Sequence, residues 1–95
     1  MARLKTPKQM ERNLKGIANH YRIEILLLIA KNKDITLDEI ITKTKANDKT
    51  IGEHTRRLFN AGLIIKTRNG NYICHSLSPY GKKFVSFLKS FQNQT

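Results

Sequence analysis

The sequence of 95 residues contains one cysteine, two prolines and no tryptophan, and it has no long hydrophobic run. The single cysteine, Cys74, excludes an internal disulfide framework. The longest aliphatic run, Ile25 to Ala30, is far shorter than the ~20 residues that a membrane-spanning helix needs. The charged N-terminus leads into no apolar signal core. These absences predict an intracellular protein in a reducing compartment, with no membrane-spanning helix.

Groups that would support catalysis or hold a cofactor are missing as well. There is no Gly-rich phosphate loop, nucleophile elbow, CxxC pair or HxxxH pair. Asp38 and Glu39 are consecutive carboxylates, which suit the first turn of a helix better than acid–base chemistry. Cys74 and His75 are adjacent on an expected strand, so they point to opposite faces and make poor co-ligands. We therefore expect no enzyme, no cofactor, no metal site and no obvious small-molecule ligand.

Acidic residues are scarce beside basic ones. Eighteen Lys and Arg against seven Asp and Glu give a net charge of +11. An excess of this size points to a polyanionic partner, either nucleic acid or an anionic membrane surface. Seven of the basic residues fall between residues 43 and 68, where Asp48 and Glu53 are the only acids. The length fits one domain.

The N-terminal half predicts two helices behind a basic arm. Residues 1–9 form the arm, and Pro7 lies near the start of the first helix. Met10, Leu14 and Ile17 then recur at helical spacing. Asn19 is a plausible N-cap for a second segment, residues 22–30, which is apolar on nearly every face and predicts a central helix. The isoleucines of that segment leave a strand as the alternative.

The next segment has the pattern of a helix-turn-helix. Thr36 and Glu39 are spaced as a capping box that opens a short helix ending near residue 43 or 44. Asn47 can cap a second helix over residues 48–61, with Ile51, Leu58 and Thr55 turned inward, and Gly62 can end that helix. Two short helices joined by such a turn are typical of this motif.

After Gly62 the apolar spacing changes to that of strands. Residues 63–68 lead into Asn69-Gly70, a strong hairpin turn signal, and residues 71–77 form the return strand. Ser78-Pro79 then begins a last helix. The predicted architecture is α+β and mostly α: a winged helix-turn-helix over residues 10–91, with a polar tail at 92–95.

Three segments resemble the ArsR-like (arsenic-repressor) family of regulators. Residues 14–26, LKGIANHYRIEIL, are similar to that family's opening signature, and residues 50–64, TIGEHTRRLFNAGLI, to its recognition helix and exit. Residues 77–81, LSPYG, look like the start of the final helix in ArsR-like, MarR-like and PadR-like proteins. The resemblance implies a DNA-binding transcriptional regulator that forms a homodimer. It does not imply metal sensing, because residues 37–40, LDEI, lack the thiols that the metal sensors of the family carry.

The candidate contacts with double-stranded DNA fall on two elements. On the recognition helix, Arg56 and Lys49 have the chemistry to donate to guanine, and Thr50 to contact a thymine methyl. In the hairpin, or wing, Arg68 suits a narrow A·T-rich minor groove. The full set is Lys49, Thr50, Gly52, Glu53, His54, Arg56 and Arg57 on the helix, and Lys66, Arg68, Asn69, Gly70 and Asn71 on the wing. An uncontacted, solvated basic face is the alternative.

A dimer seam is expected between the first and last helices. Three of the four phenylalanines lie in the last helix at helical spacing. The predicted seam residues are Met10, Leu14, Ile17, Phe84, Phe87, Leu88 and Phe91. A twofold dimer would present two recognition helices to a pseudo-palindromic site.

The interpretation that combines these patterns is a dimeric, sequence-specific repressor in the cytoplasm, associated with the nucleoid. Two alternatives keep the fold. One is a winged helix that docks RNA or another protein, and the other is an architectural protein that coats DNA without sequence preference. The membrane-surface alternative is weaker, because the apolar stripes are needed for the core and the seam.

Overall fold

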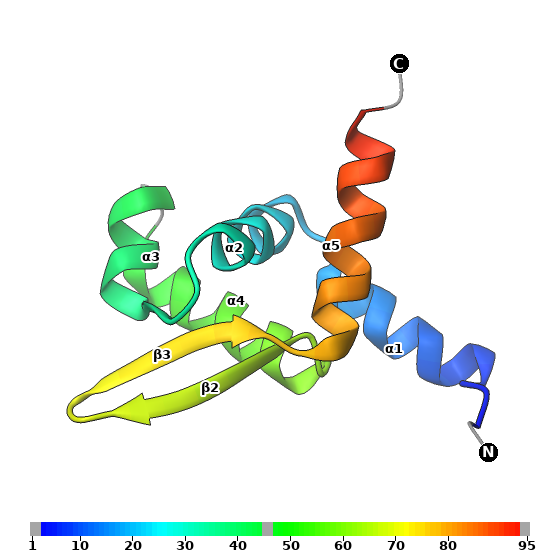
Figure 1. The fold of residues 1–95 in the computed structure, drawn as a ribbon, viewed down its shortest axis with the longest axis horizontal. Coiled ribbons are helices and arrows are strands. Elements are labelled where there is room, and N and C mark those ends of the chain that lie inside the picture. The colour runs from blue at the N-terminus through cyan, green and yellow to red at the C-terminus, as the bar shows by residue number, and fades with distance from the viewer. Residues whose placement is uncertain (1–2, 45–46, 94–95) are drawn as a thin grey trace.

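The computed structural model describes residues 3–44 and 47–93, so predictions on residues 1, 2, 45, 46, 94 and 95 lie outside it. The described residues form five helices and a three-stranded antiparallel sheet (Figure 1). In chain order they are α1 (Pro7–Ile17), α2 (His20–Lys31), β1 (Ile35–Thr36), α3 (Leu37–Thr44), α4 (Asp48–Asn60), β2 (Ile64–Asn69), β3 (Tyr72–Leu77) and α5 (Pro79–Gln92). This is the predicted winged helix-turn-helix order.

The helices begin where side chains can satisfy the first free backbone N–H groups. The Asn19 side chain accepts from the first turn of α2, and the Ser78 hydroxyl accepts from the first turn of α5. The predicted capping box is present, since Glu39 N donates to Thr36 Oγ1 at 3.3 Å and Thr36 N donates to Glu39 Oε1 at 3.0 Å. At α1 the helix starts at Pro7, so Lys8 lies in its first turn rather than in an extended arm.

Helix α2 forms the centre of the core. Its side chains Ile25, Leu26 and Ile29 are buried, and α2 packs against α3, α4, α5 and β3. The helix prediction for this segment is therefore confirmed, and the strand alternative is wrong. Figure 1 shows α2 between α3 on one side and α5 on the other, with the sheet below.

The hairpin turn lies one residue later than predicted. Asn69 pairs with Tyr72 in the β2–β3 register, so the two-residue loop is Gly70-Asn71 rather than Asn69-Gly70. Gly70 has φ 65°, while Asn71 has no positive φ. Glycine at the first loop position fits a type II′ turn, which matches the twist of the paired strands. The turn signal is correct in kind and wrong in register.

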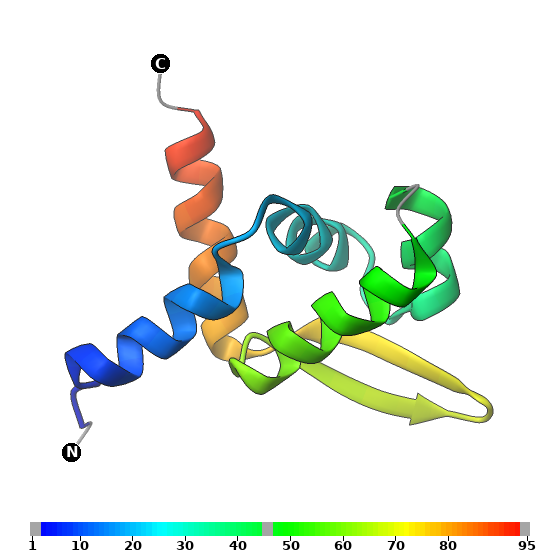
Figure 2. The same ribbon diagram turned by 180° about the vertical axis from the view of Figure 1, so that it is seen from behind.

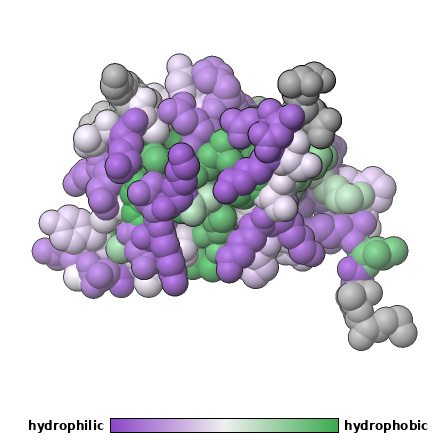
Figure 3. Space-filling model, turned by 45° about the horizontal axis from the view of Figure 1, so that its top comes forward, coloured by the Kyte–Doolittle hydropathy of each residue, from purple (hydrophilic) through white to green (hydrophobic). Residues whose placement is uncertain are grey.

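Helix α4 crosses the back of the molecule, between α1 and the helix α3 (Figure 2). Its crossing with α1 is close, because an added Cβ on Gly16 would lie 2.2 Å from the Ala61 Cβ. Gly62, with φ 77°, ends the helix and turns the chain into β2. No helix among the described residues combines the length and apolarity that a bilayer span requires. Hydrophilic side chains surround a small apolar area on the face shown in Figure 3.

Candidate nucleic-acid interface

Helix α4 separates a buried face from an exposed one. Ile51, Thr55 and Leu58 are fully buried against the core, as their helical spacing predicts. The predicted contact residues Lys49, Thr50, Arg56 and Arg57 are exposed, and Gly52 and Glu53 are half-buried beside them. The exposed face of α4 therefore brings together most of the side chains assigned to it from sequence.

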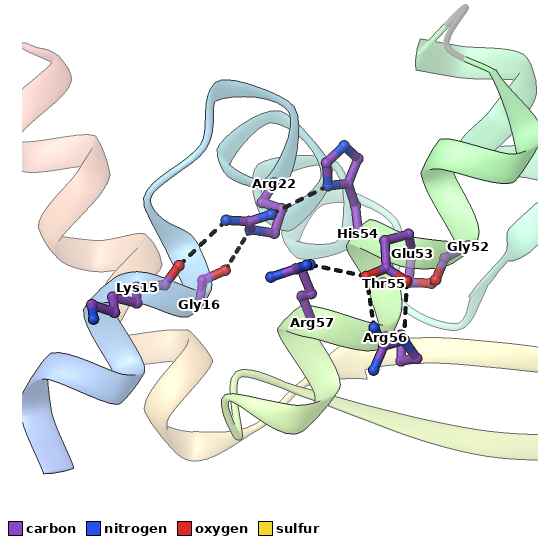
Figure 4. A network of polar contacts seen from close by, with 9 residues as sticks. All are labelled: Lys15, Gly16, Arg22, Gly52, Glu53, His54, Thr55, Arg56 and Arg57. Atoms are coloured by element: carbon purple, nitrogen blue, oxygen red, sulfur yellow. Dashed lines mark hydrogen bonds and ion pairs between the residues drawn. The ribbon is translucent and has the colours of Figure 1, made fainter.

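Glu53 binds two arginines of this face at once. Its carboxylate accepts from Arg56 Nε at 3.1 Å and Nη2 at 2.6 Å, and from Arg57 Nε at 3.0 Å. The hydrogen bond from Arg56 is the main reason that the pKa of Glu53 is lowered, and the same bond raises the pKa of Arg56. Glu53 is an acid on a mostly basic helix face, and it holds two cations in defined positions (Figure 4).

His54 corrects one predicted contact. It is 7% exposed, and its Nε2 is buried without a hydrogen-bond partner among the described residues. Burial lowers the pKa of His54, and the charges of Arg22 and Arg57 lower it further. The sequence prediction puts His54 among the DNA contacts, whereas its position on α4 turns it towards α2, where it stacks on Tyr21. Its ring is therefore buried between α4 and α2, whereas Lys49, Thr50, Arg56 and Arg57 are exposed.

Arg22 is a residue that the sequence prediction does not include. Its guanidinium is buried and joins α1 to α4: Nε donates to Gly16 O at 2.7 Å, Nη2 to Lys15 O at 3.3 Å, and Nη1 lies 3.5 Å from His54 Nδ1. Figure 4 shows Arg22 between the end of α1 and α4. A signal is present in the sequence, because position 22 precedes the buried Ile25, Leu26 and Ile29 at helical spacing and so belongs to the buried face.

The hairpin extends the charged surface of α4. Lys66 and Arg68 share a strand face with the buried Ile64, so they turn towards the helices rather than away from them. Lys66 Nζ lies 5.5 Å above the ring of Phe59 on α4. Burial lowers the pKa of Lys66, and the neighbouring charge of Arg56 adds to the effect. Asn69, Gly70 and Asn71 are exposed at the tip.

We call this combined surface the basic face. Its members are exposed or half-buried side chains of α4 and the hairpin. They are Lys49, Thr50, Arg56, Arg57, Lys66 and Arg68. The cations can be identified from the sequence without a family signature. Their arrangement into one surface depends on the register of the hairpin.

The seam residues divide into two groups. Met10, Leu14, Phe87 and Phe91 are 43%, 53%, 59% and 66% exposed, and the Phe87 and Phe91 rings stack at 5.8 Å. Phe84 and Leu88 are half-buried, and we call these six residues the apolar face. Ile17 corrects the predicted set, because it is 6% exposed and belongs to the hydrophobic core of the single chain. Helix α1 turns Ile17 inward while Met10 and Leu14 face outward.

The sulfur and imidazole groups of β3 are buried. Cys74 is buried, and His75 is almost fully buried with its Nδ1 bonded to Ile35 O at 2.9 Å. Burial lowers the pKa of His75, so the neutral ring that donates to this carbonyl is favoured. Within residues 3–44 and 47–93, no three His, Cys, Asp or Glu side chains gather where a metal ion would bind.

Of three comparisons with known proteins, two found no match and one found solved structures with a similar fold. No protein-family model matches the chain, and no curated protein does either. Among solved structures, HlyU from Vibrio cholerae has a TM-score of 0.84 at 20% identity, covering 97% of this chain and 100% of its own. The homodimeric winged helix-turn-helix DNA-binding domain of Mb0332 from Mycobacterium bovis, a possible ArsR-family regulator, has a TM-score of 0.81 at 23% identity, covering 98% and 91%.

A third similar structure is the transcriptional repressor PagR of Bacillus anthracis, with a TM-score of 0.77 at 22% identity, covering 85% of this chain and 93% of its own. Each similarity spans nearly the whole domain. Together they confirm the winged helix-turn-helix fold that the sequence predicts.

Proposed function

We propose that the protein is a double-stranded DNA-binding transcriptional regulator that acts without catalytic chemistry. The observation that carries this proposal is the basic face, in which the exposed side of α4 and the hairpin form one cationic surface. In winged-helix proteins a helix of this kind enters the major groove, and the hairpin lies on the adjacent backbone or minor groove. The solved structures that share the fold are described as transcriptional regulators, which supports the proposal.

The proposal includes a homodimer built through the apolar face. Four large apolar side chains of α1 and α5 remain substantially exposed on a single protomer, which is unusual for a surface with no partner. The similar Mb0332 domain is described as homodimeric. A twofold dimer presents two α4 helices to a pseudo-palindromic site. Occupying such a site blocks other proteins from it, and we therefore propose repression, the role given for PagR.

Two experiments test the proposal together. Selection of bound duplexes from a random DNA pool should return a site with two inverted halves about one helical turn apart. Titration with salt should give a steep linear fall of log K against log salt concentration, because binding releases counterions from phosphates. Selected sequences without any shared pattern would favour the architectural alternative. A flat salt dependence would exclude nucleic acid as the partner.

A further inference from the structure

We propose that a hollow between α1 and α4 binds a phosphate group of the DNA backbone, so that α1 is a third DNA-contacting element. This inference rests on the proposed function and adds to it, because the sequence places contacts only on α4 and the hairpin. The hollow has a volume of about 300 Å³. Four cationic residues line it: Arg12 and Lys15 from α1, and Arg56 and Arg57 from α4.

The charge in this hollow is not balanced from within the protein. Glu53 is shared between Arg56 and Arg57, and Glu11 is paired with Lys15 at 3.4 Å. A fifth cation, the buried Arg22, donates to the carbonyls of Lys15 and Gly16, which line the hollow. Burial lowers the pKa of Arg22, and the charge of Arg57 lowers it further. Five cations therefore face two carboxylates, which leaves the site ready for an anion.

Two helix ends that would repel an anion are covered by donors. Helices α1 and α4 both end beside the hollow, and free C-terminal carbonyls carry partial negative charge. At α1, Arg22 donates to the carbonyls of Lys15 and Gly16. At α4, Asn13 Nδ2 donates to Ala61 O at 2.8 Å, and Lys5 Nζ donates to Asn13 Oδ1 at 2.7 Å. The local backbone therefore does not oppose binding of a phosphate.

The position of the hollow favours the DNA backbone over an unrelated anion. Arg56 and Arg57 belong both to the basic face and to the hollow, so an anion held there lies beside the DNA that α4 contacts. Figure 4 shows Arg57 reaching from α4 towards the end of α1, where Lys15 and Gly16 lie. Planar guanidinium groups match the oxygens of a phosphate with paired hydrogen bonds. Contacts of this kind set position along the duplex and carry no base preference.

The decisive variant is Arg12→Gln/Lys15→Gln, which removes two exposed cations and leaves α4 unchanged. We expect the slope of log K against log salt to become shallower by about 0.9 per protomer, because one phosphate is no longer neutralised, equally for specific and random duplexes. Lys31→Gln/Lys33→Gln is the matched control, because it removes two charges that line neither the hollow nor the basic face. The control should keep the wild-type slope within about 0.5. Far-UV circular dichroism should confirm that both variants are folded.

Phosphate ethylation identifies the source of the anion. Ethylated phosphates flanking each half-site should weaken wild-type binding and have no such effect on the Arg12→Gln/Lys15→Gln variant. If the variant and the control have equal slopes while wild type still binds DNA, the hollow proposal is wrong and the proposed function stands. If wild type binds no DNA, both fail. Saturable shifts of the Arg12 and Gly16 amides by millimolar inorganic phosphate, with an unchanged DNA slope, would assign the hollow to a free anion and overturn the proposal.

Discussion

The basic face and the apolar face are both exposed, yet they are completed in different ways. On the basic face the cations are held by groups of the same protomer, since Glu53 fixes two arginines and Phe59 supports Lys66. On the apolar face Phe87 and Phe91 contact each other and otherwise face outward. The first surface is preorganised before a partner arrives, whereas the second needs a partner to remove its apolar area from water. The two should therefore respond to different conditions.

The largest effect should come from breaking the apolar face. Phe87→Ser/Phe91→Ser should convert the dimer to a folded monomer at micromolar concentration, because the seam loses both aromatic rings. Affinity for a two-half site should then fall by about a hundredfold or more, since the two halves no longer bind as one unit. Sedimentation velocity and binding to one-half and two-half duplexes measure the two effects.

Ile65→Ser is the control for this prediction, because Ile65 is a half-exposed apolar residue on the outer face of the hairpin. It should leave the dimer intact. A double phenylalanine variant that still sediments as a dimer would show that the apolar face is not the seam.

The basic face should lose specificity through Arg56→Ala. We expect affinity for the selected site to fall by about tenfold to a hundredfold and preference to relax at one base position, since arginine reads guanine through two bonds. The control Lys31→Ala removes an equal charge away from this face. An equal loss on specific and random duplexes would mean that Arg56 contacts only phosphate.

The buried histidines His54 and His75 should make the free energy of unfolding depend on pH, and the apolar face should not contribute to this dependence. The pKa values of His54 and His75 are both lowered, first by burial, so the unfolded chain takes up more protons just below pH ~6.5. The free energy of unfolding should fall as the pH drops from about 6.5 towards the lowered pKa values, by at most about 1.4 kcal/mol per pH unit for each histidine.

Urea unfolding between pH ~5 and ~8 measures this slope. His54→Gln should flatten it, and the Phe87→Ser/Phe91→Ser monomer should retain it, because both histidines lie inside one protomer. An unchanged slope in His54→Gln would show that His54 does not titrate with folding.

The smallest effect is expected from Glu53→Gln. Exposed ion pairs stabilise a fold little, so thermal unfolding should hardly change. Binding to random DNA should tighten, with a salt slope steeper by at most about one, because a negative charge is removed near the phosphates. The ratio of specific to random affinity should fall, since the two arginines lose their anchor. Glu24→Gln is the matched control, because it removes an acid away from the basic face, and it should leave the ratio unchanged. If Glu53→Gln also leaves the ratio unchanged, the contacts of Glu53 with Arg56 and Arg57 do not aid specificity.

The elements are predictable because their signals are local. A capping box, a proline after serine or a glycine in a turn acts within four residues, and each one marks a real boundary. The hairpin turn is displaced by one residue. The other errors concern which side of a helix is buried: Ile17 and His54 lie on helices with two possible apolar stripes, and only the packing of α1 and α4 decides between them. The paired role of Glu53 and the bridging role of Arg22 also depend on neighbours that tertiary structure brings together.

The contact between Gly16 and Ala61 has a consequence for how such a protein can change over generations. Because the two backbones meet with almost nothing between them, a larger residue at either position would force the helices apart. In the proposed dimer that crossing relates the seam helix α1 to the recognition helix α4, and so it sets the separation of the two half-sites. Substitutions on the exposed side of α4 leave the crossing untouched. The spacing of the operator should therefore be the conservative trait, and its base sequence the one free to diverge.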